Sequence, residues 1–174
     1  MITLAEQSLN AFGGKMAIDT DTDHSANGSD EPTTMQINAQ YIKDFSFENP
    51  NSPGSLQPKT EPSVEVNVDV QAVSLSDHVY EVSLTTSITG RDETQTLFII
   101  ELVYAGIFTF QGETDDNIQP GLLIDCPQLL FPFARSIISS VTQNGGFPPL
   151  LLQPVNFAQL YLDSKKDTEL NTPK

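Results

Sequence analysis

The chain has 174 residues, which is enough for one domain with a modest hydrophobic core and tight for two. Its 23 acidic and 8 basic residues give a formal net charge of −15, and so negative a field repels nucleic acid phosphates and anionic lipid. We therefore exclude nucleic acid as a partner and expect basic partners instead.

Residues 1–34 are predicted to form a disordered, acidic N-terminal extension. The stretch 17–32 is polar and acidic and contains few core-forming residues, so burial could not offset the entropy lost on ordering it. Because the polar tail reads naturally from Met16, that residue is a candidate alternative start.

The first strand is predicted over residues 35–48, where apolar and polar residues alternate. The predicted buried set is Met35, Ile37, Ala39, Tyr41, Phe45 and Phe47. Asp44, Ser46 and Glu48 then lie on the opposite, wet face. The Pro- and Asn-rich stretch 49–62 indicates a long loop before the next strand.

Three further strands are predicted from the same kind of pattern. Residues 64–70 and 80–88 alternate in the manner of half-buried strands, and the turn at 90–93 suits a hairpin. Residues 96–110 are apolar at nearly every position, so this fourth strand must be covered on both faces. Helices of the chain can cover one face, and a second subunit is a candidate for the other.

Helical periodicity appears only after the strands. Apolar residues recur at spacings of three and four between 129 and 141, with Pro127 in the first turn, Pro132 predicted to bend the helix, and Gly145 and Gly146 at its end. A shorter helix is predicted from the cap Asn156, and residues 167–174 are expected to be a flexible tail. The fold class is therefore α+β: a four-stranded antiparallel sheet followed by a long helix and a shorter C-terminal helix.

Several uncommon motifs then resemble one family, that of the SecB export chaperones. They lie in the family's order at residues 41–50, 105–108, 126–135, 146–150 and 154–157. The similarity covers roughly residues 35–165, and we take residues 35–166 as a SecB-like chaperone domain. The resemblance implies a homotetramer assembled as a dimer of dimers, with its long helices sandwiched between sheets.

The resemblance also implies two binding surfaces. A groove for unfolded precursor proteins is expected at Leu56, Phe147, Leu150 and Leu152. The secretion ATPase SecA, through a basic zinc-bearing tail of its own, is expected to bind Asp44, Glu48, Ile99 and Glu101. Ordinary core or tetramer packing is an equal alternative for each groove residue, and Phe131 and Phe133 are interpreted as core.

This chain departs from the family pattern in the loop before the second strand. Family members often carry a tryptophan there, at about the position of Thr60, whereas this chain has no tryptophan. Leu56 is a candidate for part of that role, and what else replaces the aromatic ring is open.

The residues give no pattern of catalysis or metal binding. His24 and His78 lack ligand spacing with carboxylates or cysteines, and Cys126, the only cysteine, is interpreted as a structural thiol that suits a reducing compartment. We predict no cofactor, no metal and no enzymatic activity. Two alternatives remain open: an α+β domain that binds a small ligand or acts as an enzyme, and a purely structural oligomer subunit.

We expect the protein to be cytoplasmic, without direct membrane insertion. No uninterrupted apolar run approaches the length of a membrane span, and residues 1–15 lack the basic start and apolar stretch of a signal peptide.

Overall fold

The computed structural model describes residues 34–111 and 118–170. Apart from Thr34, the predicted N-terminal extension with Met16 lies outside these residues, and so do residues 171–174 of the predicted tail.

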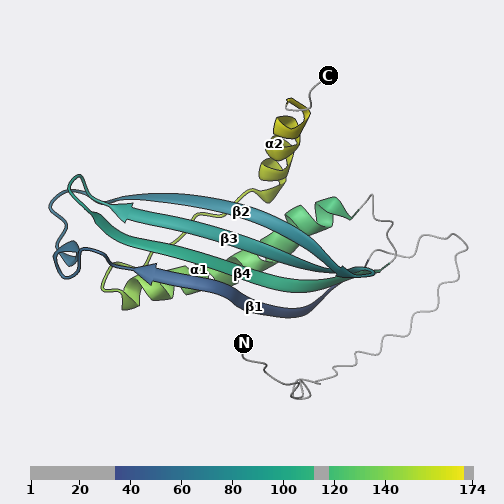
Figure 1. The fold of residues 1–174 in the computed structure, drawn as a ribbon, viewed down its shortest axis with the longest axis horizontal. Helices are drawn as coiled ribbons and strands as arrows, with labels where there is room; N and C mark the ends of the chain where they lie inside the picture. Colours follow the sequence, from purple (N-terminus) through teal and green to yellow (C-terminus); the bar gives the residue numbers. More distant parts are fainter. Residues whose placement is uncertain (1–33, 112–117, 171–174) are drawn as a thin grey trace, which may run out of the picture. The chain divides into compact units, whose positions relative to one another are not determined.

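Four strands form one antiparallel sheet, as predicted from four successive strands without intervening helices (Figure 1). They are β1 (Thr34–Glu48), β2 (Ser63–Ser76), β3 (Val79–Arg91) and β4 (Thr96–Gln111). The order across the sheet is β1-β4-β3-β2, so β1 and β2 form opposite edges. The loop 49–62 therefore crosses the end of the sheet, and it contains the short helical turn η1 (Gly54–Leu56).

The two faces of the sheet have different environments. Even-numbered residues of β4, such as Ile100, Leu102 and Phe108, are fully buried against the helical layer. Odd-numbered residues, such as Ile99 and Glu101, must point to the other face, because side chains alternate along a strand. We call the second face the outer face.

The buried face of β1 was predicted wrongly over part of its length. Ala39 and Tyr41 lie on the outer face, opposite Ile107 and Ala105 of β4. The reason is a register shift between Ile37 and Ala39 and a second between Ile42 and Asp44. Each inserts an extra residue, which reverses the alternation between them.

After the second register shift, the side chains of β1 again face the sides that the alternation predicted. Phe47 packs against the core, and Asp44, Ser46 and Glu48 pair with the outer-face residues of β4.

The helical layer begins with a π-helical turn, η2 (Gly121–Asp125), and continues as α1 (Cys126–Asn144). Leu130, Ala134, Ile138 and Thr142, spaced four apart, are buried along one side of α1. That spacing places them on one stripe facing the sheet. Helix α2 (Phe157–Leu170) follows and includes the first residues of the predicted tail.

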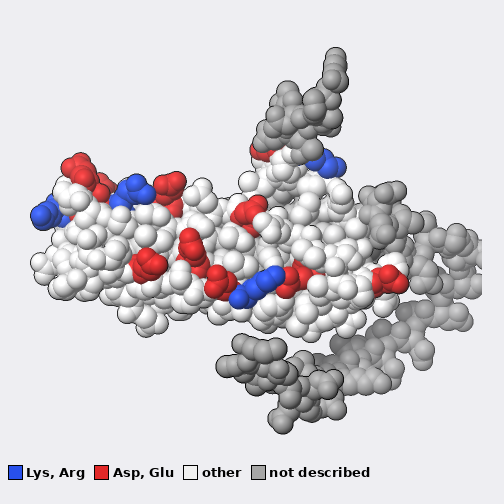
Figure 2. Space-filling view, in the orientation of Figure 1, with Lys and Arg blue, Asp and Glu red and all other residues white. Residues whose placement is uncertain are grey.

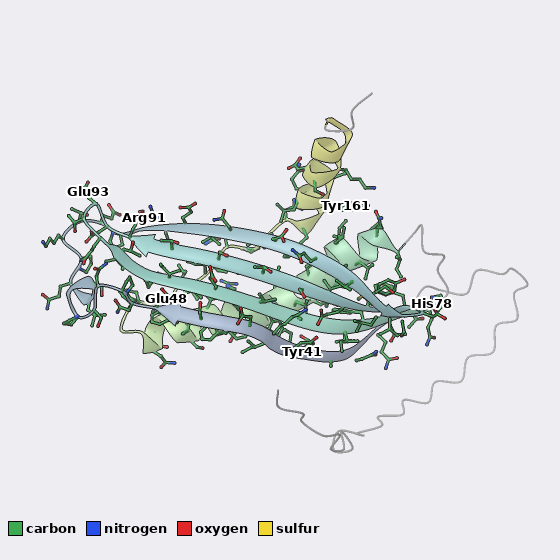
Figure 3. All side chains as sticks on the ribbon, viewed as in Figure 1. Tyr41, Glu48, His78, Arg91, Glu93 and Tyr161 are labelled. Atoms are coloured by element: carbon green, nitrogen blue, oxygen red, sulfur yellow. The ribbon has the colours of Figure 1, made fainter. Side chains whose placement is uncertain are left out.

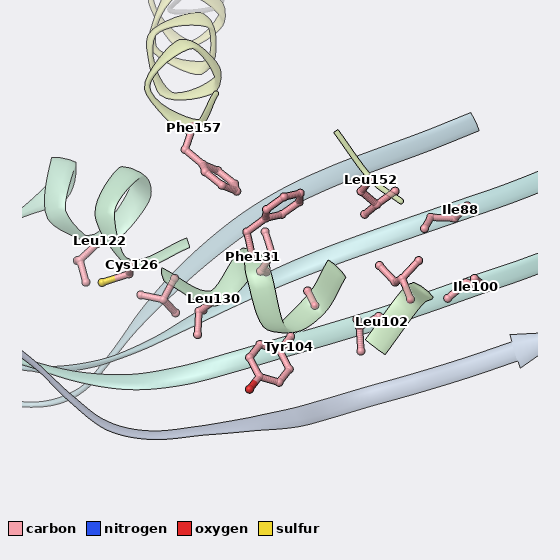
Figure 4. Packing of buried hydrophobic residues seen from close by; sticks show 14 of the residues in the cluster. Ile88, Ile100, Leu102, Tyr104, Leu122, Cys126, Leu130, Phe131, Leu152 and Phe157 are labelled. Atoms are coloured by element: carbon pink, nitrogen blue, oxygen red, sulfur yellow. The ribbon is translucent and has the colours of Figure 1, made fainter. Parts of the chain in front are cut away.

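Figure 4 shows the core between the sheet and the helices, where Cys126 and Leu130 lie with Leu122, Phe131 and Phe157. Burial raises the pKa of the Cys126 thiol to about 12. The thiol therefore stays neutral and packs as a small apolar group, in line with the structural role predicted for it.

Among the residues that the structure describes, one helical stretch, Gly121–Asn144, is long and apolar enough to cross a membrane by length and composition. A core helix of a soluble protein passes the same test. This stretch contains polar residues, and its buried stripe packs on the sheet.

Candidate functional site

The four residues predicted to bind SecA come together on the outer face. Glu48 of β1 lies directly opposite Ile99 of β4, Ser46 lies opposite Glu101, and Asp44 lies opposite Val103. All three carboxylate residues are exposed, and Ile99 is half-buried. We call Asp44, Glu48, Ile99 and Glu101 the acidic patch.

Figure 2 shows acidic side chains distributed over this side of the sheet, with few basic ones among them. Glu48 lies near the end of β1, on the same strand as Tyr41 (Figure 3). The three carboxylates lie in a row along the two strands, from Glu48 beside Ile99 at one end to Asp44 at the other. This surface attracts a basic segment and can also bury an apolar contact at Ile99.

A polar network lies beside the acidic patch. Lys43 Nζ donates to Glu81 Oε2 at 2.5 Å, and the Tyr41 hydroxyl donates to the other carboxylate oxygen of Glu81. The hydrogen bond from Lys43 lowers the pKa of Glu81, and the hydrogen bond to Glu81 raises the pKa of Tyr41 to about 12. Because Lys43 neutralises Glu81, the net negative charge of this region resides on the acidic patch.

The predicted client groove is partly assembled at the end of α1. Leu56 is 43 % exposed, and its side chain lies on Gly146, where an added Cβ would approach Leu56 Cδ2 to 3.0 Å. Gly146 has a φ of +89°, a left-handed conformation that suits glycine. The Phe147 ring packs on Phe98 with a centroid distance of 4.9 Å, and Leu150 is half-buried against the core.

Leu152 does not belong to an accessible groove. It is 5 % exposed and packs in the core with Ile88 (Figure 4). Its neighbour Leu151 is 61 % exposed. In an extended segment successive side chains point to opposite sides. The sequence does not show which side of this segment faces the core, so it could not tell which of the two leucines faces solvent. We use the name loop surface for the exposed and half-buried apolar side chains of the two loops, Leu56, Phe147, Leu150 and Leu151, without implying that they share one face.

The interpretation of Phe131 and Phe133 as core holds for the first residue only. Phe131 is buried against Phe157, whereas Phe133 is 48 % exposed and stacks on Tyr104 with a centroid distance of 6.0 Å.

A second apolar surface was missed by the sequence reasoning. Shallow hollows run between β1 and α1 and are lined by Tyr41, Ile42, Phe45, Tyr104, Phe133, Ser136, Ile137, Ser140, Val141 and Asn144. Ile42 is 50 % exposed and Phe45 is 39 % exposed. The one signal in the sequence was Ile42, an apolar residue at an even position in a strand whose other apolar residues are odd. We call this surface the β1–α1 groove.

Among residues 34–111 and 118–170, no three His, Cys, Asp or Glu side chains group closely enough to hold a metal ion. His78 lies in the turn between β2 and β3, at the far end of the sheet from Arg91 and Glu93 (Figure 3).

Comparison with known proteins matches the chain to one family. The model of the family described as preprotein translocase subunit SecB matches residues 28–168. The chain is similar to a protein-export protein SecB from Bartonella quintana, with 44 % identity over 84 % of this chain and 92 % of the relative. It is also similar to one from Rhodospirillum centenum, with 50 % identity over 73 % of this chain and 77 % of the relative.

A solved structure shows the same fold at low sequence identity. It is a SecB-like chaperone from Mycobacterium tuberculosis in complex with a peptide from an antitoxin, with a TM-score of 0.59, 15 % identity, and coverage of 70 % of this chain and 90 % of that one. The family match over most of the chain, together with the identity to these relatives, establishes that the chain belongs to the SecB family.

Proposed function

We propose that this protein is a cytoplasmic export chaperone, which binds unfolded precursor proteins without catalysis and delivers them to the SecA motor. One observation carries the proposal: apolar side chains stand exposed on a well-packed domain that also presents three carboxylates on its outer face. Exposed apolar patches on soluble proteins mark binding sites, and membership of the SecB family indicates which kind of binding to expect.

Client binding is proposed for the loop surface. Leu56 and Leu151 are exposed, and unfolded chains present the apolar side chains that folded proteins bury. Burying apolar area yields roughly 25 cal/mol per Å², whatever the sequence that supplies it. Such a surface can bind many different unfolded clients, and it does not bind folded proteins because their apolar side chains are buried. The peptide bound to the similar M. tuberculosis chaperone supports peptide binding by this fold.

Delivery is proposed for the acidic patch. A basic segment of SecA would be attracted to Asp44, Glu48 and Glu101, and Ile99 would provide an apolar contact at one end of the patch, opposite Glu48. The patch lies on the outer face, whereas the loop surface lies at the end of α1, so a client and the motor could bind at the same time.

Assembly into a homotetramer is proposed to use the β1–α1 groove. Ile42, Phe45 and Phe133 line this groove and expose apolar area. A second copy of the chain would bury this area, as the expected dimer of dimers requires. A client that wraps several loop surfaces of one tetramer gains avidity without any single tight site.

The test is the refolding of a reduced precursor protein. The purified chain at saturating concentration should slow refolding without nucleotide. Refolding at the unassisted rate would refute the proposed function.

A further inference from the structure

The loop that carries Leu56 is tied at both ends to the hairpin between β3 and β4. Before Leu56, Asn51 Nδ2 donates to the Thr96 carbonyl oxygen at 2.9 Å. After Leu56, the Lys59 backbone N–H donates to Asp92 Oδ2 at 3.2 Å, and the Glu93 backbone N–H donates to Thr60 Oγ1 at 3.2 Å. We call Asn51, Thr60 and Asp92 the loop clasp. Its bonds span 33 to 45 residues of sequence.

Asp92 links the hairpin to the loop because its two oxygens accept hydrogen bonds from different elements. Oδ1 accepts hydrogen bonds within the hairpin, from the Thr94 N–H at 2.7 Å, the Thr94 hydroxyl at 2.7 Å and the Gln95 N–H at 2.9 Å. Oδ2 accepts the bond from Lys59 of the loop. The residue is 7 % exposed, so a carboxylate there needs these donors. One side chain thus both shapes the turn and anchors the loop.

The clasp occupies the region where the family tryptophan is expected. Thr60 stands at about that position, and its hydroxyl is engaged by the hairpin N–H of Glu93. In relatives that carry the tryptophan, its ring could hold the loop by apolar packing. This chain holds the loop with hydrogen bonds instead. Both segments lie at the same end of the sheet, where Figure 3 labels Arg91 and Glu93.

We propose that Asp92 is a positioning residue for client binding: through the loop clasp it holds Leu56 against Gly146 as one wall of the loop surface. This inference rests on the proposed function, since it assigns Leu56 to the client surface. Without the clasp, Leu56 would keep its contact with Gly146 for only part of the time. The apparent affinity for a client is then reduced in proportion to the fraction of time that Leu56 spends in contact with Gly146.

The decisive variant is Asp92→Asn. An asparagine keeps one acceptor oxygen for Thr94 and Gln95, but its amide nitrogen cannot accept the Lys59 N–H. The hairpin turn is thereby retained while the loop loses its bond to Asp92, and the bonds of Asn51 and Thr60 remain. The matched control is Glu93→Gln. This substitution removes one negative charge at the next residue and keeps the hydrogen bond that the backbone N–H of residue 93 donates to Thr60 Oγ1.

Two measurements on the full chain test the proposal. Hydrogen exchange of the η1 amides, Ser55 and Leu56, should be about tenfold faster in Asp92→Asn and unchanged in Glu93→Gln. The dissociation constant for a reduced, unfolded precursor should rise about three- to tenfold in Asp92→Asn only. The melting temperature and solution mass of each variant serve as the check on folding.

The outcomes separate the two proposals. If the wild-type chain binds no unfolded precursor, the proposed function fails, and so does any client role for Asp92. If the wild-type chain binds and Asp92→Asn binds equally well, the positioning role alone is refuted. Unchanged hydrogen exchange at Ser55 and Leu56 in Asp92→Asn also refutes the positioning role, whatever the result of the client-binding measurement.

Discussion

The Phe47 ring occupies the space into which a side chain at Gly145 would extend: a Cβ built on Gly145 would lie 2.3 Å from Phe47 Cζ. Gly145 ends α1 with an ordinary right-handed φ of −75°, so the constraint there is space rather than backbone conformation. Phe47 in turn stacks on Phe98, with a centroid distance of 6.5 Å, so the ring has neighbours that limit its retreat.

Gly145→Ala should therefore destabilise the fold. Overpacking of this kind costs about 1–3 kcal/mol, measurable as a lower midpoint in urea unfolding. Gly54→Ala is the matched control, because nothing lies within 4 Å of a Cβ added at Gly54. Equal midpoints for the two variants would show that the Phe47 ring moves aside at no cost.

The neighbouring leucines Leu151 and Leu152 should separate binding from stability. Leu152→Ala removes buried side-chain volume from the core and should cost about 2–5 kcal/mol of unfolding free energy. Leu151→Ala, at an exposed position, should change stability by less than about 0.5 kcal/mol and still weaken client binding. Urea unfolding and precursor binding measured on both variants check this; weaker client binding by a folded Leu152→Ala variant, with Leu151→Ala unaffected, would reverse the assignment.

The strands of the sheet show which features could be predicted from the sequence and which could not. The strands were predictable because alternation is local, and spacing alone places Asp44 and Glu48 on one face of β1. That these residues form one patch with Ile99 and Glu101 of β4 was implied by the resemblance to the SecB family. The two register shifts in β1 were not predictable, because an inserted residue leaves no mark in composition.

The loop clasp was also beyond the reach of sequence patterns. Asp92 reads as an ordinary turn residue, and its bond to Lys59 spans 33 residues. Only the placement of the loop across the end of the sheet brings the two together.

Charge reversal on the acidic patch should affect the motor more than the client. Asp44→Lys combined with Glu101→Lys is expected to weaken SecA binding by about tenfold or more, with little change in client affinity. The loss should be greatest at low salt, because the Debye length grows from about 8 Å at 0.15 M to about 30 Å at 0.01 M. Asp77→Lys, in the turn between β2 and β3, is the control. Parallel losses of SecA and client binding would mean that the patch serves another purpose.

The stabilising effect of Asp92 should depend on pH in a defined direction. Hydrogen bonds, first from the Thr94 hydroxyl, lower its pKa from 3.8 to about 2. A carboxyl whose pKa is depressed by folding stabilises the folded state above its unfolded pKa, and that contribution disappears as the pH falls to the folded pKa. The stability difference between wild type and Asp92→Asn should therefore be constant above about pH 4 and shrink toward about pH 2. Unfolding curves at several pH values measure it, and a difference that grows on acidification would contradict the bonding described.

The β1–α1 groove provides the last prediction, because it links an exposed apolar surface to assembly. Phe133→Asp places a carboxylate on the ring position that stacks on Tyr104, and a second copy of the chain could not bury it without a large desolvation cost. Light scattering should then show a species smaller than the tetramer, while the circular dichroism spectrum of the fold is retained. Leu75→Asp, at a 53 % exposed position near the end of β2, should leave the mass unchanged. A tetramer that tolerates the Phe133→Asp substitution would place the subunit contact elsewhere, and the groove would then be free to bind clients directly.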